Sequence, residues 1–268
     1  MNNSMISAAV TMNGLQRKLD LISDNIANLD TVGYKAKQGS FQDTLTRVQQ
    51  QGKSFQLDGR RTDAGFNLGF GARMGEVTVD LTQGPLKETG SLSDLAIEGN
   101  AVFEIQVNGE KAWTREGAFQ LAPNGADTRN VYLMTNQGHP VMGTNGQPIR
   151  IPAASKLQVD SDGTVRALNA NGTSTAAGQI ALARVDRSEG LVQTDGNVFI
   201  LADGVNEGDV LTNNGVTAQV RQQYLEQSNV DMTAQMTELL QAQRAYQLAA
   251  KALTSSDTMA TLANGIRQ

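Results

Sequence analysis

The sequence contains no cysteine, and this absence excludes several kinds of protein site. A chain of 268 residues without cysteine forms no disulfide bonds and offers no thiolate ligands to zinc or iron–sulfur clusters. The absence does not fix the compartment in which the protein works. It does suit a protein that has to cross, unfolded, into an oxidising space.

Long apolar runs and basic stretches are missing as well. No apolar run approaches the roughly 18 residues of a membrane-spanning helix, so we expect no membrane insertion. The first ten residues lack the basic region and apolar block of a secretory signal peptide. The net charge is −5 and lysine and arginine are scattered, which argues against nucleic acid as a partner. The length allows one or two domains with a sizeable core.

Residues suited to catalysis or metal binding are scarce. The only histidine, His139, lies in a turn-like Gly-His-Pro run and has no second histidine to share a metal ion. The run from Asp160 to Gly163 opens like a calcium loop, but the twelfth position is Asn171 instead of glutamate, so a β-turn is the better interpretation. We therefore expect no catalytic, cofactor-binding or metal-binding residue, and no enzyme activity.

The first 29 residues predict one long amphipathic helix. Apolar side chains recur in steps of four and three residues from Met1 to Leu29, which is the spacing of a coiled-coil seam. Polar residues occupy the opposite face. We expect the helix to end between Asn28 and Gly33, because asparagine, aspartate and glycine tolerate turn conformations. A single helix cannot bury its own apolar stripe, so this helix needs a partner.

The C-terminal end of the chain supplies a candidate partner helix. From about Val230 onward there is no proline, glycine occurs only at Gly265, and large apolar residues recur at helical spacing. Ser228 and Asn229 precede the run, as suits a helix start. Its alanines spread round more than one face, so we expect this helix to contact several neighbours closely. The alternative is a helix pair that closes one globular domain, which composition alone favours.

Between the two helices the apolar period changes to two, which predicts an all-β region over 76–215. Phe103, Ile105 and Val107 alternate with polar residues. The pair Asn108-Gly109 then predicts a hairpin turn. Further Asn-Gly and Asp-Gly pairs, several of them about ten to twenty residues apart, indicate an antiparallel sandwich or barrel. Before this region, Phe41 and Leu45 are spaced to pack a short helical turn over 40–48, which precedes a weakly structured linker.

Four motifs stand in order along the chain. Ser23 to Lys35 reads Ser-Asp-Asn-Ile-Ala-Asn-Leu-Asp-Thr-Val-Gly-Tyr-Lys. Thr82 to Gly99 contains Thr-Gln-Gly, then Thr-Gly, then Asp-Leu-Ala-Ile-Glu-Gly. Trp113 to Phe119 reads Trp-Thr-Arg-Glu-Gly-Ala-Phe. Ser228 to Met232 reads Ser-Asn-Val-Asp-Met, and Gln-Arg-Ala-Tyr follows at 243–246.

These motifs resemble the signature of bacterial flagellar rod and hook proteins, and they cover nearly the whole chain. The departures are mild: Asp24 and Asp30 replace common asparagines, and Ala101-Val102-Phe103 replaces Gly-Phe-Phe. The matching signature residues are Asn25, Asn28, Thr31, Gly33, Tyr34, Lys35, Ser228, Asn229, Val230, Gln243 and Arg244.

The resemblance implies a specific architecture. The expected fold class is α+β, with N- and C-terminal helices forming a coiled coil and an all-β antiparallel domain inserted between them. The expected divisions are a helix and signature turn at 1–34, an extended linker at 35–75, the all-β domain at 76–215, and a C-terminal segment and helix at 216–268. The expected assembly interface comprises Met5, Met12, Leu15, Leu19, Ile22, Ile26, Met236, Leu239, Ala242, Ala245, Tyr246, Ala249 and Leu253.

The resemblance also implies partners and a location. The chain is expected to polymerise with itself into a hollow helical tube, to adjoin other flagellar rod and hook proteins, and to pass through the flagellar export apparatus. It is expected in the basal body, outside the cytoplasmic membrane, after export without a cleaved signal peptide. One β domain without a second insertion is most similar to distal-rod subunits. A short hook subunit is the alternative within the family, and a secreted ligand-binding β domain with oligomerising helices is the alternative outside it.

Overall fold

The structure is a computed structural model that describes residues 3–43, 72–123, 129–169, 172–194, 196–213 and 218–265. These residues form helices and antiparallel strand pairs, so the predicted α+β class is confirmed. The chain divides into two compact units. The first comprises 1–24, 38–77 and 232–268, and the second comprises 25–37 and 78–231.

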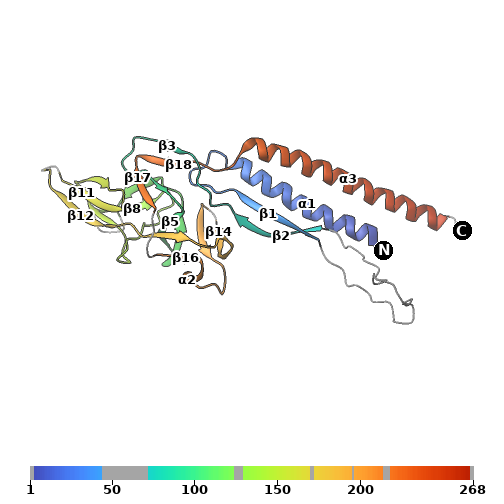
Figure 1. The fold of residues 1–268 in the computed structure, drawn as a ribbon, viewed down its shortest axis with the longest axis horizontal. Helices are drawn as coiled ribbons and strands as arrows, with labels where there is room; N and C mark the ends of the chain where they lie inside the picture. The colour runs from blue at the N-terminus through green and yellow to red at the C-terminus, as the bar shows by residue number, and fades with distance from the viewer. Residues whose placement is uncertain are drawn as a thin grey trace, which may run out of the picture. The chain divides into compact units, whose positions relative to one another are not determined.

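Two long helices dominate the first unit and lie side by side (Figure 1). They are α1 (Asn3–Ala27) and α3 (Met232–Gly265). The start of α1 and the end of α3 lie at the same end of the pair, so the helices run antiparallel (Figure 1). The end predicted for the first helix is confirmed, because a turn follows Ala27 and Gly33 adopts a φ of +69°. α3 begins just after Asp231, slightly later than predicted.

A two-stranded sheet of β1 (Lys37–Asp43) and β2 (Ala72–Val79) completes the described part of the first unit. The predicted helical turn over 40–48 is therefore wrong for 40–43, and 44–48 lie outside the described residues. Strands also occupy both ends of the predicted linker. Gly39 approaches Met74 so closely that a Cβ atom at position 39 would overlap the Met74 methyl group. Pairing with a strand that is distant in sequence thus outweighs the local helical spacing.

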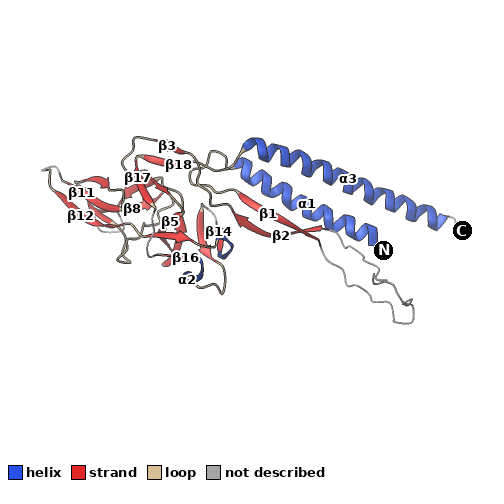
Figure 2. Ribbon diagram, viewed as in Figure 1, coloured by secondary structure: helices blue, strands red, loops and turns tan. Residues whose placement is uncertain are grey.

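The second unit is a β domain built around a six-stranded sheet (Figure 2). The strand order is β14-β15-β6-β5-β13-β16, and the pairings are antiparallel. The strands are β5 (Ala101–Val107), β6 (Glu110–Thr114), β13 (Leu182–Val185), β14 (Leu191–Thr194), β15 (Val198–Leu201) and β16 (Leu211–Thr212).

Smaller sheets surround this one. The two-stranded sheets pair β3 (Leu86–Glu88) with β18 (Tyr224–Glu226), and β4 (Leu95–Glu98) with β17 (Gln219–Gln222). One three-stranded sheet contains β7 (Phe119–Ala122), β8 (Asn130–Thr135) and β9 (Arg150–Pro152). The other contains β10 (Lys156–Val159), β11 (Thr164–Leu168) and β12 (Ser174–Gln179). Short helices are η2 (Ser188–Gly190) and α2 (Glu207–Val210). Because β17 and β18 follow residue 215, strands continue beyond the predicted β range, while the domain division itself stays a prediction.

Two hydrophobic clusters lie on the two faces of the six-stranded sheet. Phe103 and Ile105 belong to one cluster, and Val102 and Trp113 belong to the other. Adjacent residues of a strand point to opposite faces, so both faces of β5 are covered. The alternating pattern predicted one polar face, but Val102 and Glu104 are both buried. Residues of α2 and its flanks, such as Val210, cover that second face.

Tight turns join neighbouring strands at two of the predicted positions. Asn108 and Gly109 join β5 to β6 with φ values of +52° and +92°, so the predicted hairpin is confirmed. Asp160 accepts a backbone hydrogen bond from Gly163 at 3.0 Å in the β10–β11 connection. This confirms the β-turn interpretation of the calcium-like run. The Asn124-Gly125 pair lies outside the described residues.

Candidate functional site

The predicted seam of α1 is the first candidate surface. Leu15 and Ile22 are buried, whereas Met5, Met12 and Leu19 are half-buried. Exposed polar residues occupy the opposite side of the helix. The seam is therefore partly covered within a single chain. Ile26, also half-buried, lies in the last turn of α1, which belongs to the second unit.

α3 has an inner face and an outer face. The inner face is the less exposed one, and its members recur in steps of three and four: Leu239, Ala242, Tyr246, Ala249 and Leu253, with Ala245 beside them. Ala242 is only 3% exposed. Glu238 also lies on this face, and its carboxylate is 3.3 Å from Lys18 Nζ of α1. Both side chains are partly in water, so this ion pair contributes about 0–1 kcal/mol.

The outer face of α3 carries large apolar side chains in water. Leu240 is 55% exposed and Leu248 is 67% exposed. At about 100° per residue these positions lie opposite the inner face. The exposed apolar residues of α3 are Met232, Met236, Leu240, Leu248, Met259 and Leu262. A helix that is apolar on two opposite faces has surface left over for a further neighbour.

The signature residues of the first motif fix the chain just after α1. Asn25 Nδ2 donates to the Lys37 carbonyl at 2.9 Å, and Asn25 Oδ1 accepts from the Lys37 N–H at 2.9 Å and from the Tyr34 hydroxyl at 3.1 Å. Asn28 Oδ1 accepts from Thr31 Oγ1 at 3.1 Å in the turn. Asn25 donates and accepts at once, which a carboxylate cannot do.

A buried ionic cluster joins the first motif to the other three. Lys35 Nζ lies 2.7 Å from Glu226 Oε1, and Arg115 Nε lies 2.6 Å from Glu226 Oε2. The Gly84 N–H also donates to Glu226 Oε1 at 2.8 Å. Lys35 belongs to the first motif, Gly84 to the second and Arg115 to the third, while Glu226 lies two residues before the fourth. We call Lys35, Arg115 and Glu226 the ionic cluster.

Backbone carbonyls complete the coordination of the two cations. Lys35 Nζ donates to the Thr82 carbonyl at 2.6 Å, and the Arg115 guanidinium donates to the carbonyls of Gly99, at 2.7 Å, and Ala101. Burial lowers the pKa of the Lys35 ammonium below its ordinary value, because loss of water penalises the charged form, while the Glu226 carboxylate opposes this shift. The cluster is costly to bury and depends on all of its members.

The fourth motif binds the segment after Lys35. Asn229 Oδ1 accepts from the Ala36 N–H at 2.8 Å, and Asn229 Nδ2 donates to the Asp80 carbonyl at 2.9 Å. Ser228 Oγ accepts from the Val230 N–H at 3.3 Å. Val230 packs in a small cluster with Tyr34 and Ala36. Gln243 and Arg244, by contrast, lie exposed on α3 in the first unit.

Gly33 shows why the first motif requires glycine. Its φ is positive, and a Cβ atom there would lie 2.6 Å from the Glu116 backbone. Its N–H donates to the Glu226 carbonyl at 2.8 Å. Arg115 lies in the third sequence motif, whereas no sequence pattern singled out Glu226. The only local signal for Glu226 is an acidic residue that ends a short, otherwise uncharged strand.

The described residues offer little that suits other chemistry. They contain no group of three or more His, Cys, Asp or Glu side chains placed to hold a metal ion. Within the same part of the chain, no helix is long and apolar enough to cross a membrane. His139 lies in the turn after β8, where its N–H donates to Thr135 Oγ1 at 3.1 Å.

Three protein-family descriptions match separate parts of the chain. "Flagella basal body rod protein" matches residues 5–35, "Flagellar hook protein FlgE/F/G D1 domain" matches 96–167, and "Flagellar basal body rod FlgEFG protein C-terminal" matches 221–266. The first match contains most of α1, and the last match contains all of α3. All three also contain a member of the ionic cluster.

Full-length relatives agree with these matches. The flagellar hook-basal body complex protein FlhP of Bacillus subtilis is 31% identical over 100% of both chains. The flagellar basal-body rod protein FlgG of the same organism is 33% identical over 96% of both chains. The flagellar basal-body rod protein FlgF of Caulobacter vibrioides is 32% identical over 96% of this chain and 94% of its own.

Proposed function

This chain belongs to the family of bacterial flagellar basal-body rod and hook proteins, and on that premise we propose that it forms the distal part of the rod. It is a structural subunit of the flagellar basal body and assembles with itself and with other rod and hook proteins. Its alignment with the flagellar basal-body rod protein FlgG over 96% of both lengths supports the distal rod, because FlgG is the distal-rod protein.

One observation supports polymerisation most directly, namely that α3 is apolar on two faces. The inner face is partly covered in a single chain, and the outer face holds Leu240, Leu248 and Leu262 in water. Each large apolar residue buried in an interface stabilises it by about 1.5–3 kcal/mol. Contact between the outer face and a neighbouring subunit, repeated along the rod, therefore favours assembly.

We further propose that α1 and α3 pair as a coiled coil in the wall of the rod. The heptad-like steps on the inner face of α3 match the seam of α1 in spacing. The Lys18–Glu238 ion pair supports this register. The α1 seam then comprises Met5, Met12, Leu15, Leu19, Ile22 and Ile26. The inner face of α3 comprises Leu239, Ala242, Ala245, Tyr246, Ala249 and Leu253, and Met236 lies on the outer face.

The ionic cluster holds the segments beside both helices against the β domain. We propose that it keeps these segments fixed while the motor turns the rod, so that torque reaches the hook. A catalytic role is not part of this function. Passage through the flagellar export apparatus, without a cleaved signal peptide, would place the subunit outside the cytoplasmic membrane.

Electron microscopy of basal bodies from a strain that lacks this chain tests the proposal. We expect a shortened rod without a hook, and restoration of both by the wild-type gene. A complete rod without a hook would instead make the chain a hook subunit. A basal body with no rod at all would place the chain nearer the membrane.

A further inference from the structure

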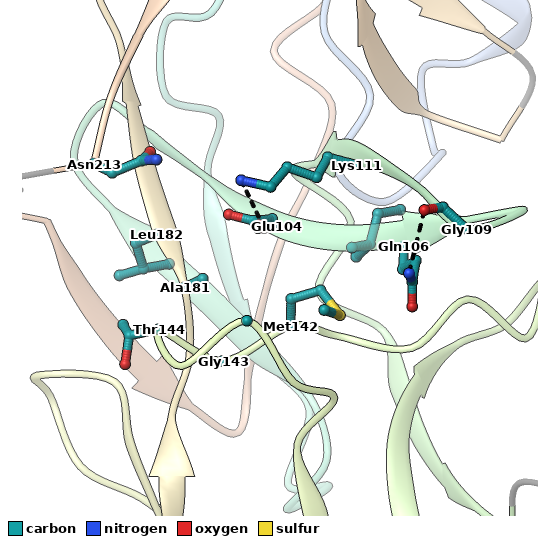
Figure 3. Close-up of a pocket in the computed structure, with 12 residues that line it drawn as sticks. Glu104, Gln106, Gly109, Lys111, Met142, Gly143, Thr144, Ala181, Leu182 and Asn213 are labelled. Carbon is teal, nitrogen blue, oxygen red and sulfur yellow. Dashed lines mark hydrogen bonds and ion pairs between the residues drawn. The ribbon is translucent and has the colours of Figure 1, made fainter. Parts of the chain in front are cut away.

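A pocket of about 490 Å³ opens beside the β5–β6 hairpin (Figure 3). Its walls come from the hairpin, from the loop at 142–146, from β13 and from the residue after β16. The volume lies within the range of about 300–1,000 Å³ that ligand pockets usually have. Most of its polar groups project from the hairpin side, where Glu104 and Lys111 lie together (Figure 3).

Glu104 is the unusual group in this pocket. Its side chain is only 9% exposed, yet its ion-pair partner among the described residues, Lys111 Nζ, is 3.6 Å away. A charge-assisted hydrogen bond would be about 2.7–2.9 Å long. Removing a carboxylate from water is costly unless it is closely paired. A cation that comes closer than Lys111 would therefore stabilise the Glu104 carboxylate further.

Lys111 can give up this contact at little cost. Its side chain is 56% exposed, and Nζ lies 3.5 Å from a second carboxylate, that of Glu207. Burial lowers the pKa of Lys111, but the Glu104 and Glu207 carboxylates together outweigh burial and raise this pKa above its ordinary value. If Lys111 moves away from Glu104, it keeps Glu207 as a partner and keeps its charge largely in water.

Other side chains of the pocket carry oxygen atoms that can accept hydrogen bonds. Gln106 Nε2 donates to the Gly109 carbonyl at 3.3 Å, so the side-chain oxygen of Gln106 points away from Gly109 (Figure 3). Thr144 and Asn213 add further side-chain oxygens at the other edge (Figure 3). A guanidinium group carries five N–H donors in one plane and no acceptor. This donor set suits a buried carboxylate with oxygens beside it.

We propose that the pocket binds an arginine side chain of a second copy of this chain, with its guanidinium against Glu104. The arginine stem would lie along Met142 and Leu182, as long cationic side chains do on apolar surface. The identity of the occupant rests on the proposed homopolymer. Among the described arginines of the β domain, Arg150 and Arg187 are exposed and have no ion pair, so they are the candidate donors.

Two variants separate this proposal from a merely structural ion pair. Glu104→Gln and Lys111→Met both remove the Glu104–Lys111 contact. If the contact only stabilises the fold, both variants act in the same direction. If Glu104 receives an arginine, the variants act in opposite directions, because one removes the receptor and the other removes its competitor.

The first experiment titrates the purified full chain with Nα-acetyl-arginine amide and follows its backbone amides by NMR. We expect saturable shifts around Glu104 and Thr144, about tenfold weaker binding by Glu104→Gln, and about threefold tighter binding by Lys111→Met. The citrulline analogue, which has the same shape without the charge, should cause no saturable shift. Equal shifts with both compounds, or no shifts with either, would refute the proposal that the pocket binds a guanidinium group.

The second experiment tests the occupant in the cell. Glu104→Gln should reduce rod assembly, and Arg150→Gln or Arg187→Gln should reproduce that loss, with secretion of the subunit unchanged. Normal rods in all three strains would refute the proposal that an arginine of a second copy of this chain occupies the pocket. The titration does not depend on rod assembly, so it tests the pocket alone. If the pocket binds arginine but the chain builds no rod, the proposed function is refuted and the pocket is not.

Discussion

The Glu226 carboxylate accepts hydrogen bonds from Lys35, Arg115 and the Gly84 backbone, at 2.6–2.8 Å. Lys35 and Glu226 are separated by 191 residues, and both side chains are fully or almost fully buried. Two cations therefore share one carboxylate in the interior. Removing that carboxylate would leave both cations without a counter-charge, which is a more severe change than the loss of one surface ion pair.

We predict that Glu226→Gln destabilises the β domain by about 3–5 kcal/mol. Urea unfolding of the full chain, followed by the fluorescence of its single tryptophan, measures this change, because Trp113 is buried in the domain. Glu88→Gln is the control, since Glu88 is exposed and the change should stay within about 0.5 kcal/mol. Equal midpoints for the two variants would refute the role given to the ionic cluster.

Glu116 gives a prediction about pH. Burial raises the pKa of its carboxyl above the ordinary value, although Asn136 donates a hydrogen bond that opposes the shift. The folded state therefore holds this proton more tightly than the unfolded state, and stability falls as pH rises through the interval between the two pKa values. Glu116→Gln does not titrate. Its thermal midpoint should exceed that of the wild type most near neutral pH, and least below the unfolded pKa. A wild type that is more stable than the variant at neutral pH would contradict this.

Among the helices and strands, α3 is the one whose two faces should respond differently to substitution. Ala242 is buried on the inner face, so Ala242→Leu should overpack this face and cost about 1–3 kcal/mol within one chain. Leu240 and Leu248 are exposed, so changing them should leave the single chain as stable as before.

We predict that the double variant Leu240→Gln, Leu248→Gln is secreted and folded but builds few rods. Polar side chains remove the apolar area that a neighbouring subunit would bury. Counting of hook-basal bodies by electron microscopy, with the secreted subunit measured by immunoblotting, checks both halves of the prediction. Leu92→Gln is the matched control, an exposed leucine on the β domain. A normal number of rods in the double variant would mean that the outer face is not a subunit contact.

The sequence predicted these helices well because their information is local. The three-four spacing around Leu15 and Ile22 indicated a buried face, and both are buried. The alanines of the C-terminal helix indicated contacts on more than one face. β1 was missed because its stability comes from pairing with β2, which the sequence near Phe41 does not reveal. Glu226 was missed for the same reason, since its partners lie more than 100 residues away.

At the scale of the whole molecule, the division into units follows the signature motifs instead of the helix ends. The second unit includes 25–37 and extends to Asp231, so the last turn of α1 and the residues before α3 belong with the β domain. The signature residues Asn25, Lys35 and Asn229 all lie in this unit. The family motifs thus fix the chain segments that follow α1 and precede α3, and the helices themselves supply the proposed assembly surfaces.

Photo-crosslinking in assembled basal bodies shows whether this chain builds the rod through the outer face of α3. A benzophenone amino acid in place of Leu248 should crosslink a second copy of the chain in isolated hook-basal bodies and should give no crosslink in the secreted monomer. A product of monomer size alone from intact basal bodies, in a strain that still swims, would contradict the account.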